Sequence, residues 1–128
     1  MKKLILIFIA IFALTAAVSA KTTETFSLHT GGQKTVVHGK ITVKFVSVLE
    51  DSRCPANAKC IWAGNAKIRI SVRSGRRAAK TFELSSTLSP KSVTYDGFEI
   101  AFVELNPIPG IDKRPRLKNP VATLSVTK

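Results

Sequence analysis

The sequence predicts a single all-β domain, an antiparallel sandwich or a small barrel of about seven to eight short strands with one disulfide. Beyond residue 20, apolar and polar residues alternate with a period of two through most segments, which is typical of strands with one buried and one solvent-facing side. Glycine-containing turns separate these segments. No window of a dozen residues keeps the i, i+3, i+4, i+7 apolar spacing of a long amphipathic helix.

The start of the chain has the pattern of a secretory signal peptide. A short basic beginning is followed by an unbroken apolar run over 4–14, and the segment ends in Val18-Ser19-Ala20, which signal peptidase accepts. The run is too short to form a stable transmembrane helix. We therefore expect cleavage after Ala20, a signal peptide over 1–20 and a single β-domain over 21–128.

The mature domain is expected in the periplasm or outside the cell. No cysteine follows the cleavage site at Lys21, so no lipid attachment is expected. Removing the first twenty residues with their two lysines leaves 108 residues and lowers the net charge from +12 to +10. A chain of this size supports one core of modest size, which excludes a multidomain protein and most large enzyme folds.

The first strands are recognised by their alternation and by a glycine turn. One strand is predicted at about 24–28 and a second begins near Lys34, with Thr30-Gly31-Gly32 between them. In a third strand, over about 40–49, the apolar phase slips at Phe45-Val46. The slip indicates either a β-bulge or burial on both faces.

The later strands follow the same pattern. The turn at 74–77 separates two of them, and Asp96-Gly97 is a strong signal for a two-residue hairpin. The predicted strands are at about 66–73, 82–84, 92–95, 98–102 and 122–126. The segment 106–120 carries four prolines, which remove ladder donors, so it is predicted to be a long, locally stiff loop.

Cys54 and Cys60 are predicted to form a disulfide, because both are exported and close in sequence. The bridge closes a seven-residue loop, worth about 2.4 kcal/mol in the chain-entropy model. A redox pair would need a Cys-x-x-Cys spacing at the start of a helix. A zinc site would need His29 and His38 to join the cysteines, in a spacing that matches no familiar cluster.

The residues around the cysteines form a recognisable motif. Asp51-Ser52-Arg53-Cys54-Pro55, then Cys60, then Trp62-Ala63-Gly64-Asn65-Ala66 resembles the signature of small bacterial secreted proteins and lipoproteins with no assigned activity. The resemblance implies an exported bacterial β-domain. It transfers no catalytic residue to this chain.

The motif is interpreted as architecture. Asp51 and Ser52 favour a turn, Pro55 stiffens the loop, and Gly64 indicates a bulge or a positive φ. The ring of Trp62 is expected to pack on the disulfide or on an inner sheet face. The rival interpretation is an exposed stacking platform for a sugar or a base. Structural roles are thus assigned to Asp51, Pro55, Trp62, Gly64 and Asn65.

A basic surface is predicted at one end of the domain. If the strands run as an up-and-down series from Lys40, the loops 54–60, 85–91 and 106–120 lie at one end. The turns at 74–77 and 96–97 then lie at the other. This ordering gathers a predicted anion- or partner-binding set: Arg53, Lys59, Lys91, Lys113, Arg114, Arg116 and Lys118.

Composition argues against catalysis. The mature chain holds two histidines and three aspartates, and nothing in the sequence links them to a nucleophile or to one another. We therefore predict no catalytic residue, no metal site and no cofactor. Nucleic acid is not the expected partner, because aromatic residues are not interleaved with the charges.

The favoured hypothesis is an exported, non-catalytic binding or structural module. It would recognise an anionic envelope component or an acidic protein through its basic surface. One alternative is a protein inhibitor that presents the 106–120 loop to a protease, and another is a small hydrolase that its motifs do not reveal. The simplest reading of the charge itself is protection of strand edges and solubility.

Overall fold

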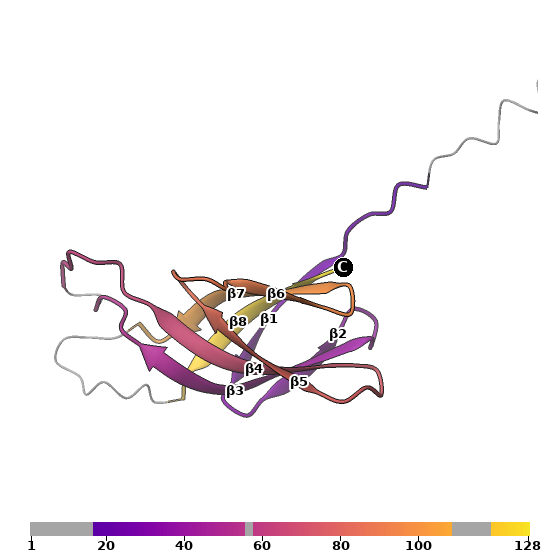
Figure 1. Ribbon diagram of the computed structural model, residues 1–128, viewed down its shortest axis with the longest axis horizontal. Coiled ribbons are helices and arrows are strands. Elements are labelled where there is room, and N and C mark those ends of the chain that lie inside the picture. The colour runs from indigo at the N-terminus through magenta and orange to yellow at the C-terminus, as the bar shows by residue number, and fades with distance from the viewer. Residues whose placement is uncertain (1–16, 56–57, 109–118) are drawn as a thin grey trace, which may run out of the picture.

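A computed structural model describes residues 17–55, 58–108 and 119–128. These residues form eight strands and no helix, so this part of the chain has no helical segment that could cross a membrane. The strands are β1 (Thr23–His29), β2 (Gln33–Val36), β3 (Ile41–Asp51), β4 (Ala66–Ser74), β5 (Lys80–Ser85), β6 (Ser92–Tyr95), β7 (Phe98–Asn106) and β8 (Val121–Thr127) (Figure 1).

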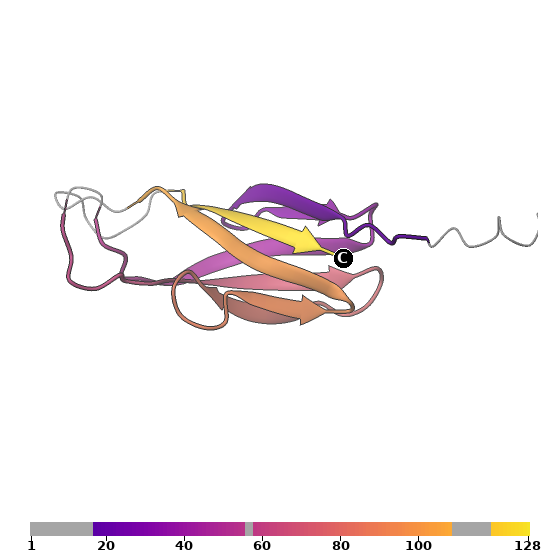
Figure 2. The same cartoon turned by 90° about the horizontal axis from the view of Figure 1, so that it is seen from above.

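The strands pack as a sandwich of two antiparallel sheets. One sheet has the order β1-β8-β7-β6 and the other has the order β2-β3-β4-β5. Both sheets lie along the long axis of the domain (Figure 2). The all-β prediction is confirmed, and of the two predicted architectures the sandwich is the one formed.

The chain changes sheets twice, after β1 and after β5, so it is not one simple up-and-down series. The first crossing uses the predicted glycine turn, where Gly31 N donates to Phe45 O at 2.7 Å and Phe45 N donates to Gly32 O at 3.0 Å. At the second crossing, Ser85 N donates to Pro90 O at 2.8 Å. Consecutive strands still run in opposite directions at both crossings. The loops are therefore divided between the two ends of the domain as predicted.

Alternation along each strand builds the core. In β4 every second residue from Ala66 is fully buried, and the residues between them face solvent. Phe45 of β3 and Leu124 of β8 are among the largest side chains with no exposed surface. They belong to opposite sheets, so a single apolar layer between the sheets holds the sandwich together.

The predicted irregularity in β3 is a β-bulge. Its pairing with β4 shifts register between Phe45 and Ser47, and again between Val48 and Glu50. A third shift, between Phe102 and Glu104, interrupts the pairing of β7 with β8. Each bulge leaves one residue unpaired, which is why Leu49 and Val103 are exposed although they lie in strands.

The loops divide between two ends, as the sequence predicted. At one end, Arg77 Nη1 lies 3.3 Å from Asp96 Oδ1, and Ser74 Oγ donates to the same carboxylate. Gly75 N also donates to Lys40 O at 3.1 Å. We call this the turn end, made by 37–40, 74–77 and 96–97. The loops that follow β3, β5 and β7 lie at the other end, which we call the loop end (Figure 1).

The turn between β2 and β3 holds two non-glycine residues at positive φ, the buried Val37 at 53° and the exposed His38 at 55°. His38 and Gly39 have φ values of 55° and 75°, and Lys40 N donates to Val37 O at 3.2 Å, as in a type I′ turn. Histidine pays a steric cost at positive φ. Asparagine tolerates this conformation and commonly precedes glycine in such turns.

We therefore expect His38→Asn to raise the free energy of unfolding by about 0.5 kcal/mol, because it removes that cost and touches no packed surface. Urea denaturation measures the change. The matched control is His29→Asn, which makes the same substitution at an exposed strand residue and should stabilise nothing. An equal gain in both variants would contradict the explanation.

Candidate functional site

The most distinctive feature of the loop end is the disulfide loop between β3 and β4. Cys54 and Cys60 are bonded, with their Cα atoms 5.9 Å apart, as predicted. While this bond is formed, neither sulfur is a thiolate that could bind zinc. Elsewhere in the described residues, no three His, Cys, Asp or Glu side chains come together as metal ligands.

The two ends of this loop are pinned together where it leaves the sheet. Ser52 N donates to Asn65 O at 2.8 Å, and Asn65 N donates to Ser52 Oγ at 3.1 Å. Gly64 has a φ of 69°, and a Cβ placed on it would lie 2.7 Å from Arg53 Cα and closer still to Ser52 O. The positive φ predicted for Gly64 is thus confirmed, and the close approach is a second reason for glycine.

Arg53 braces the loop against the end of β7. Its Nε and Nη2 bind both oxygens of Asp51, at 2.7 and 2.9 Å. Nη1 donates to Leu105 O, and Nη2 also donates to Pro107 O at 3.0 Å. The side chains of Arg53 and Asp51 are only 15% and 10% exposed. Arg53 was predicted among the anion-binding residues, but its guanidinium is engaged in a structural network instead.

Asn65 ties the disulfide loop to the loop that follows β5. Its side chain is buried, and Oδ1 accepts hydrogen bonds from Thr87 N at 3.2 Å, Thr87 Oγ1 at 3.1 Å and Leu88 N at 3.4 Å. The Nδ2 group has no hydrogen-bond partner among residues 17–55, 58–108 and 119–128. The structural role predicted for Asn65 is therefore fulfilled by a side chain that joins two loops.

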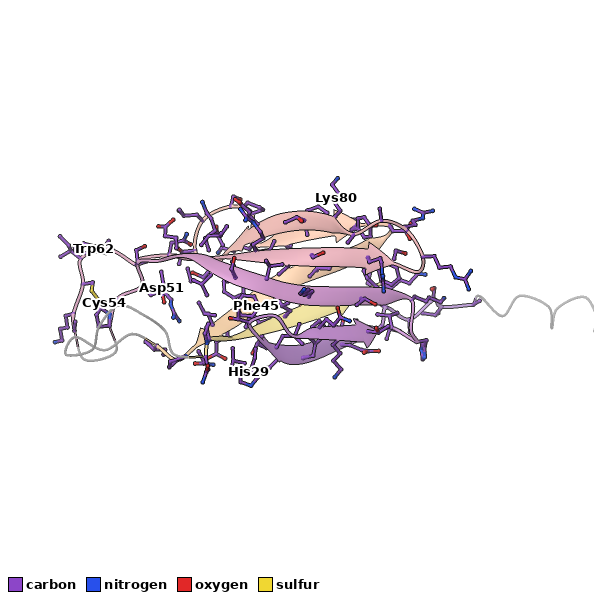
Figure 3. The ribbon with its side chains drawn as sticks, turned by 90° about the horizontal axis from the view of Figure 1, so that it is seen from below. His29, Phe45, Asp51, Cys54, Trp62 and Lys80 are labelled. Atoms are coloured by element: carbon purple, nitrogen blue, oxygen red, sulfur yellow. A yellow bond between two sulfur atoms is a disulfide. The ribbon has the colours of Figure 1, made fainter. Side chains whose placement is uncertain are left out.

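The sequence analysis expected Trp62 to pack on the disulfide or on an inner sheet face, but Trp62 does not lie on an inner sheet face. It is 63% exposed, and its neighbour Ile61 is 98% exposed. Figure 3 shows Trp62 beyond the end of the sheets, on the same projection as Cys54. The ring is therefore not buried between the sheets, so that part of the prediction is wrong, while packing on the disulfide stays a prediction. The rival interpretation, an exposed ring, describes its position.

Exposed apolar side chains concentrate at the loop end. Besides Ile61 and Trp62, this end carries Leu88 and Ile108, and Leu49 lies in the bulge that leads to it. The three turns of the opposite end expose no large apolar side chain. Because large exposed apolar groups are informative when they gather, the loop end is a candidate contact surface.

The predicted basic set is only partly described by the structure. Lys59 and Lys91 are exposed at the loop end, as predicted. Lys113, Arg114, Arg116 and Lys118 lie outside the described residues, so their placement stays a prediction. The same holds for the inhibitor hypothesis, which depends on that loop.

A stronger charge asymmetry separates the two sheets. β1, β6, β7 and β8 contain no lysine or arginine. Their solvent-facing positions are mostly hydroxyls, with Glu99 and Glu104 exposed among them, and two hydroxyl pairs bond across β1 and β8: Thr23–Thr127 and Ser27–Thr123. We call this side the hydroxyl face.

The other sheet carries every strand cation of the described residues. Four of them point outward from β3 and β4 and define what we call the basic face: Lys44, Lys67, Arg69 and Arg73. Arg69 is paired with Glu83 at 3.2 Å, in a half-exposed ion pair. The sequence analysis placed the basic surface at the end formed by the loops, because it lacked the sheet order that separates these cations from the hydroxyl face.

Gly64→Ala is expected to lower the free energy of unfolding by about 3 kcal/mol or more, because the new Cβ combines positive-φ strain with a backbone clash at Ser52 O. Gly75→Ala is the control. Its φ is also positive, at 56°, but nothing lies within 4 Å of the added Cβ, so it should cost only about 1 kcal/mol. Chemical denaturation measures both, and equal losses would refute a steric role for Ser52.

Arg53→Met keeps the aliphatic stem but leaves the carboxylate of Asp51 without its partner. We expect a loss of about 2 kcal/mol in unfolding free energy, since both groups are largely buried. Arg69→Met removes the half-exposed pair with Glu83 and should cost less than about 1 kcal/mol. If Arg53→Met proved as mild as Arg69→Met, the bracing role would be wrong.

Comparisons with protein-family models, with curated proteins and with solved structures found no significant match to this chain.

Proposed function

We propose that the protein is an exported, non-catalytic module that attaches to an anionic surface of the bacterial envelope through its basic face. The observation that carries this proposal is the segregation of charge between the two sheets. A cationic side opposite an uncharged or acidic side orients the molecule in the field of an anionic surface. Charge spread evenly for solubility would not produce this contrast.

The position of the cations within their sheet supports the same function. Lysines that protect a sheet from aggregation belong on its edge strands. Lys34 of β2 and Lys80 of β5 are on edges and fit that role. The basic face instead lies on β3 and β4, the two central strands, where Lys44, Lys67 and Arg69 are each paired with a strand on both sides and protect no edge.

The spacing of the basic face suits an extended ligand. Outward residues two positions apart on a strand are separated by about 6.6 Å, so Lys67 and Arg69 follow each other at this spacing along β4 and Arg73 lies about 13 Å beyond Arg69. Lys44 and Arg73 have no acidic residue opposite them in the ladder, because their partners are Gln33, Ser71 and Thr42. A row of separated charges favours a surface with many anionic groups over a single small ion.

Two further observations favour export and binding over catalysis. The Cys54–Cys60 bridge is a bond that persists in oxidising compartments. The two histidines lie at opposite ends of the sandwich, because His29 pairs with the first residue of β8 and His38 belongs to the turn end. They are therefore not a pair that could share one proton-transfer site.

The test is binding to vesicles made of equal parts phosphatidylglycerol and phosphatidylethanolamine. The double variant Lys44→Gln/Arg73→Gln should bind roughly 30-fold more weakly, since each cation near an anionic bilayer contributes about 1 kcal/mol. High salt should abolish the difference, because it screens exposed charges.

The matched control is Lys21→Gln/Lys128→Gln. It changes the net charge equally, at residues that flank β1 and β8 of the other sheet. We expect it to retain most of the binding. Equal losses in the two double variants would show that net charge alone matters and would overturn the basic face as the binding surface.

A further inference from the structure

The disulfide loop presents two large apolar side chains to solvent on a rigid support. Ile61 is 98% exposed and Trp62 is 63% exposed, side by side in sequence. Lys59, on the same loop, is also exposed. We call these three residues the tip.

The support beneath the tip is braced by three independent contacts. The Cys54–Cys60 bond closes the loop, the Ser52 and Asn65 hydrogen bonds hold its ends together, and Arg53 fastens it to the carbonyls of β7 and Pro107. A braced loop loses little conformational entropy when its apex is bound. The exposure of the tip is therefore built into the fold and does not come from a loose chain that could fold back.

We infer that Ile61 and Trp62 insert into the interfacial region of an anionic lipid bilayer. This inference rests on the proposed function, because it takes the anionic surface to be a lipid membrane. Tryptophan has a large apolar ring and one N–H donor, and it is enriched where hydrocarbon meets the polar headgroups. Inserting the isoleucine side chain at the same depth removes its apolar surface from water, which lowers the free energy of the bound state.

The tip and the basic face can serve one surface, because the loop grows from the two central strands of the basic sheet. β3 ends at Asp51 and β4 begins at Ala66, and the loop between them extends past the sheet (Figures 1 and 3). Lys67, the first outward cation of β4, lies just after the loop returns. Lys59 precedes Ile61 and Trp62 along the chain and Lys67 follows them, and cations next to apolar side chains match anionic headgroups above a hydrocarbon layer.

The depth of insertion is limited by the loop's own backbone. Unpaired backbone groups are costly in hydrocarbon, and 58–63 contains no strand. Side chains can therefore enter the interface while the backbone remains among the headgroups. This arrangement gives reversible attachment and not a membrane-spanning anchor.

Trp62 reports on the inference directly, since it is the only tryptophan of the chain. When the purified protein is mixed with the phosphatidylglycerol vesicles, we expect its emission to shift to shorter wavelength. Lipids brominated on the acyl chains should quench it, and acrylamide in the water should quench it less than before. Sedimentation of the vesicles measures binding in the same samples.

A pair of matched variants separates insertion from charge. Ile61→Ser should weaken vesicle binding roughly tenfold, because an apolar side chain no longer leaves water. Val103→Ser removes an exposed apolar side chain of β7, on the sheet that carries the hydroxyl face, and should leave binding unchanged. Both sites are exposed, so the thermal midpoint should be the same in both variants.

Each failure has a different meaning. If the protein sediments with vesicles but the emission of Trp62 stays the same, the basic face binds alone and the insertion is wrong. If Ile61→Ser weakens binding while Lys44→Gln/Arg73→Gln does not, the insertion stands and the basic face is wrong. If the protein ignores vesicles but binds immobilised polyphosphate in a salt-sensitive way, an anionic surface is the partner and the lipid is wrong.

Discussion

The close approach of the backbone at Ser52 and Gly64 is the constraint on which the loop end depends. It forces the chain leaving β3 and the chain entering β4 to run together beyond the sheet. The disulfide therefore lies outside the sandwich and contributes nothing to its core. The same pinning directs Arg53 toward the end of β7 and Asn65 toward the loop after β5. One backbone contact thus joins three loops that are distant in sequence.

Local patterns predicted most of the fold, because its strands and turns are local features. Period-two alternation located the strands, Asp96-Gly97 located a hairpin, and the phase slip at Phe45-Val46 located a bulge. Each connection reverses the direction of the chain, whichever sheet the next strand joins. Alternate connections therefore lie at opposite ends of the domain, and this grouping could be predicted from the order of the strands alone. The sheet order did not follow, since it depends on where the chain crosses between layers.

The errors at the candidate site have a common physical origin. Residue type suggested that Arg53 would be free to bind an anion and that Trp62 would pack on the disulfide or on an inner sheet face, yet the surroundings decide both. The partners of Arg53 include the backbone carbonyl of Leu105, 52 residues away. A hydrogen bond to a distant backbone carbonyl leaves no signal in the local sequence. Trp62 is carried past the sheets by the pinned loop, and in the described part of the chain its side chain stays 63% exposed. Side-chain chemistry states what a residue prefers, while topology decides what it meets.

The charge of the protein also has a structural meaning that composition could not provide. A net charge of +12 could be spread over the whole surface, in which case it would serve solubility. The described strands instead carry six lysines and arginines, of which none lies in β1, β6, β7 or β8 and four lie on β3 and β4, the central strands of the other sheet. Like charges held on neighbouring strands repel one another, so this arrangement costs stability that an even distribution would avoid.

The basic face and the tip would contribute to different stages of attachment. Long-range charge acts before contact, so it raises the rate of encounter and orients the molecule. An apolar contact acts only after water has been displaced, so it governs the rate of release. Insertion can follow the electrostatic encounter directly, because Ile61 and Trp62 are already exposed on a braced loop and need no rearrangement once the basic face has met the surface. The surface of a sandwich of this size is small. The basic face and the tip are both built on β3, β4 and the loop that joins them.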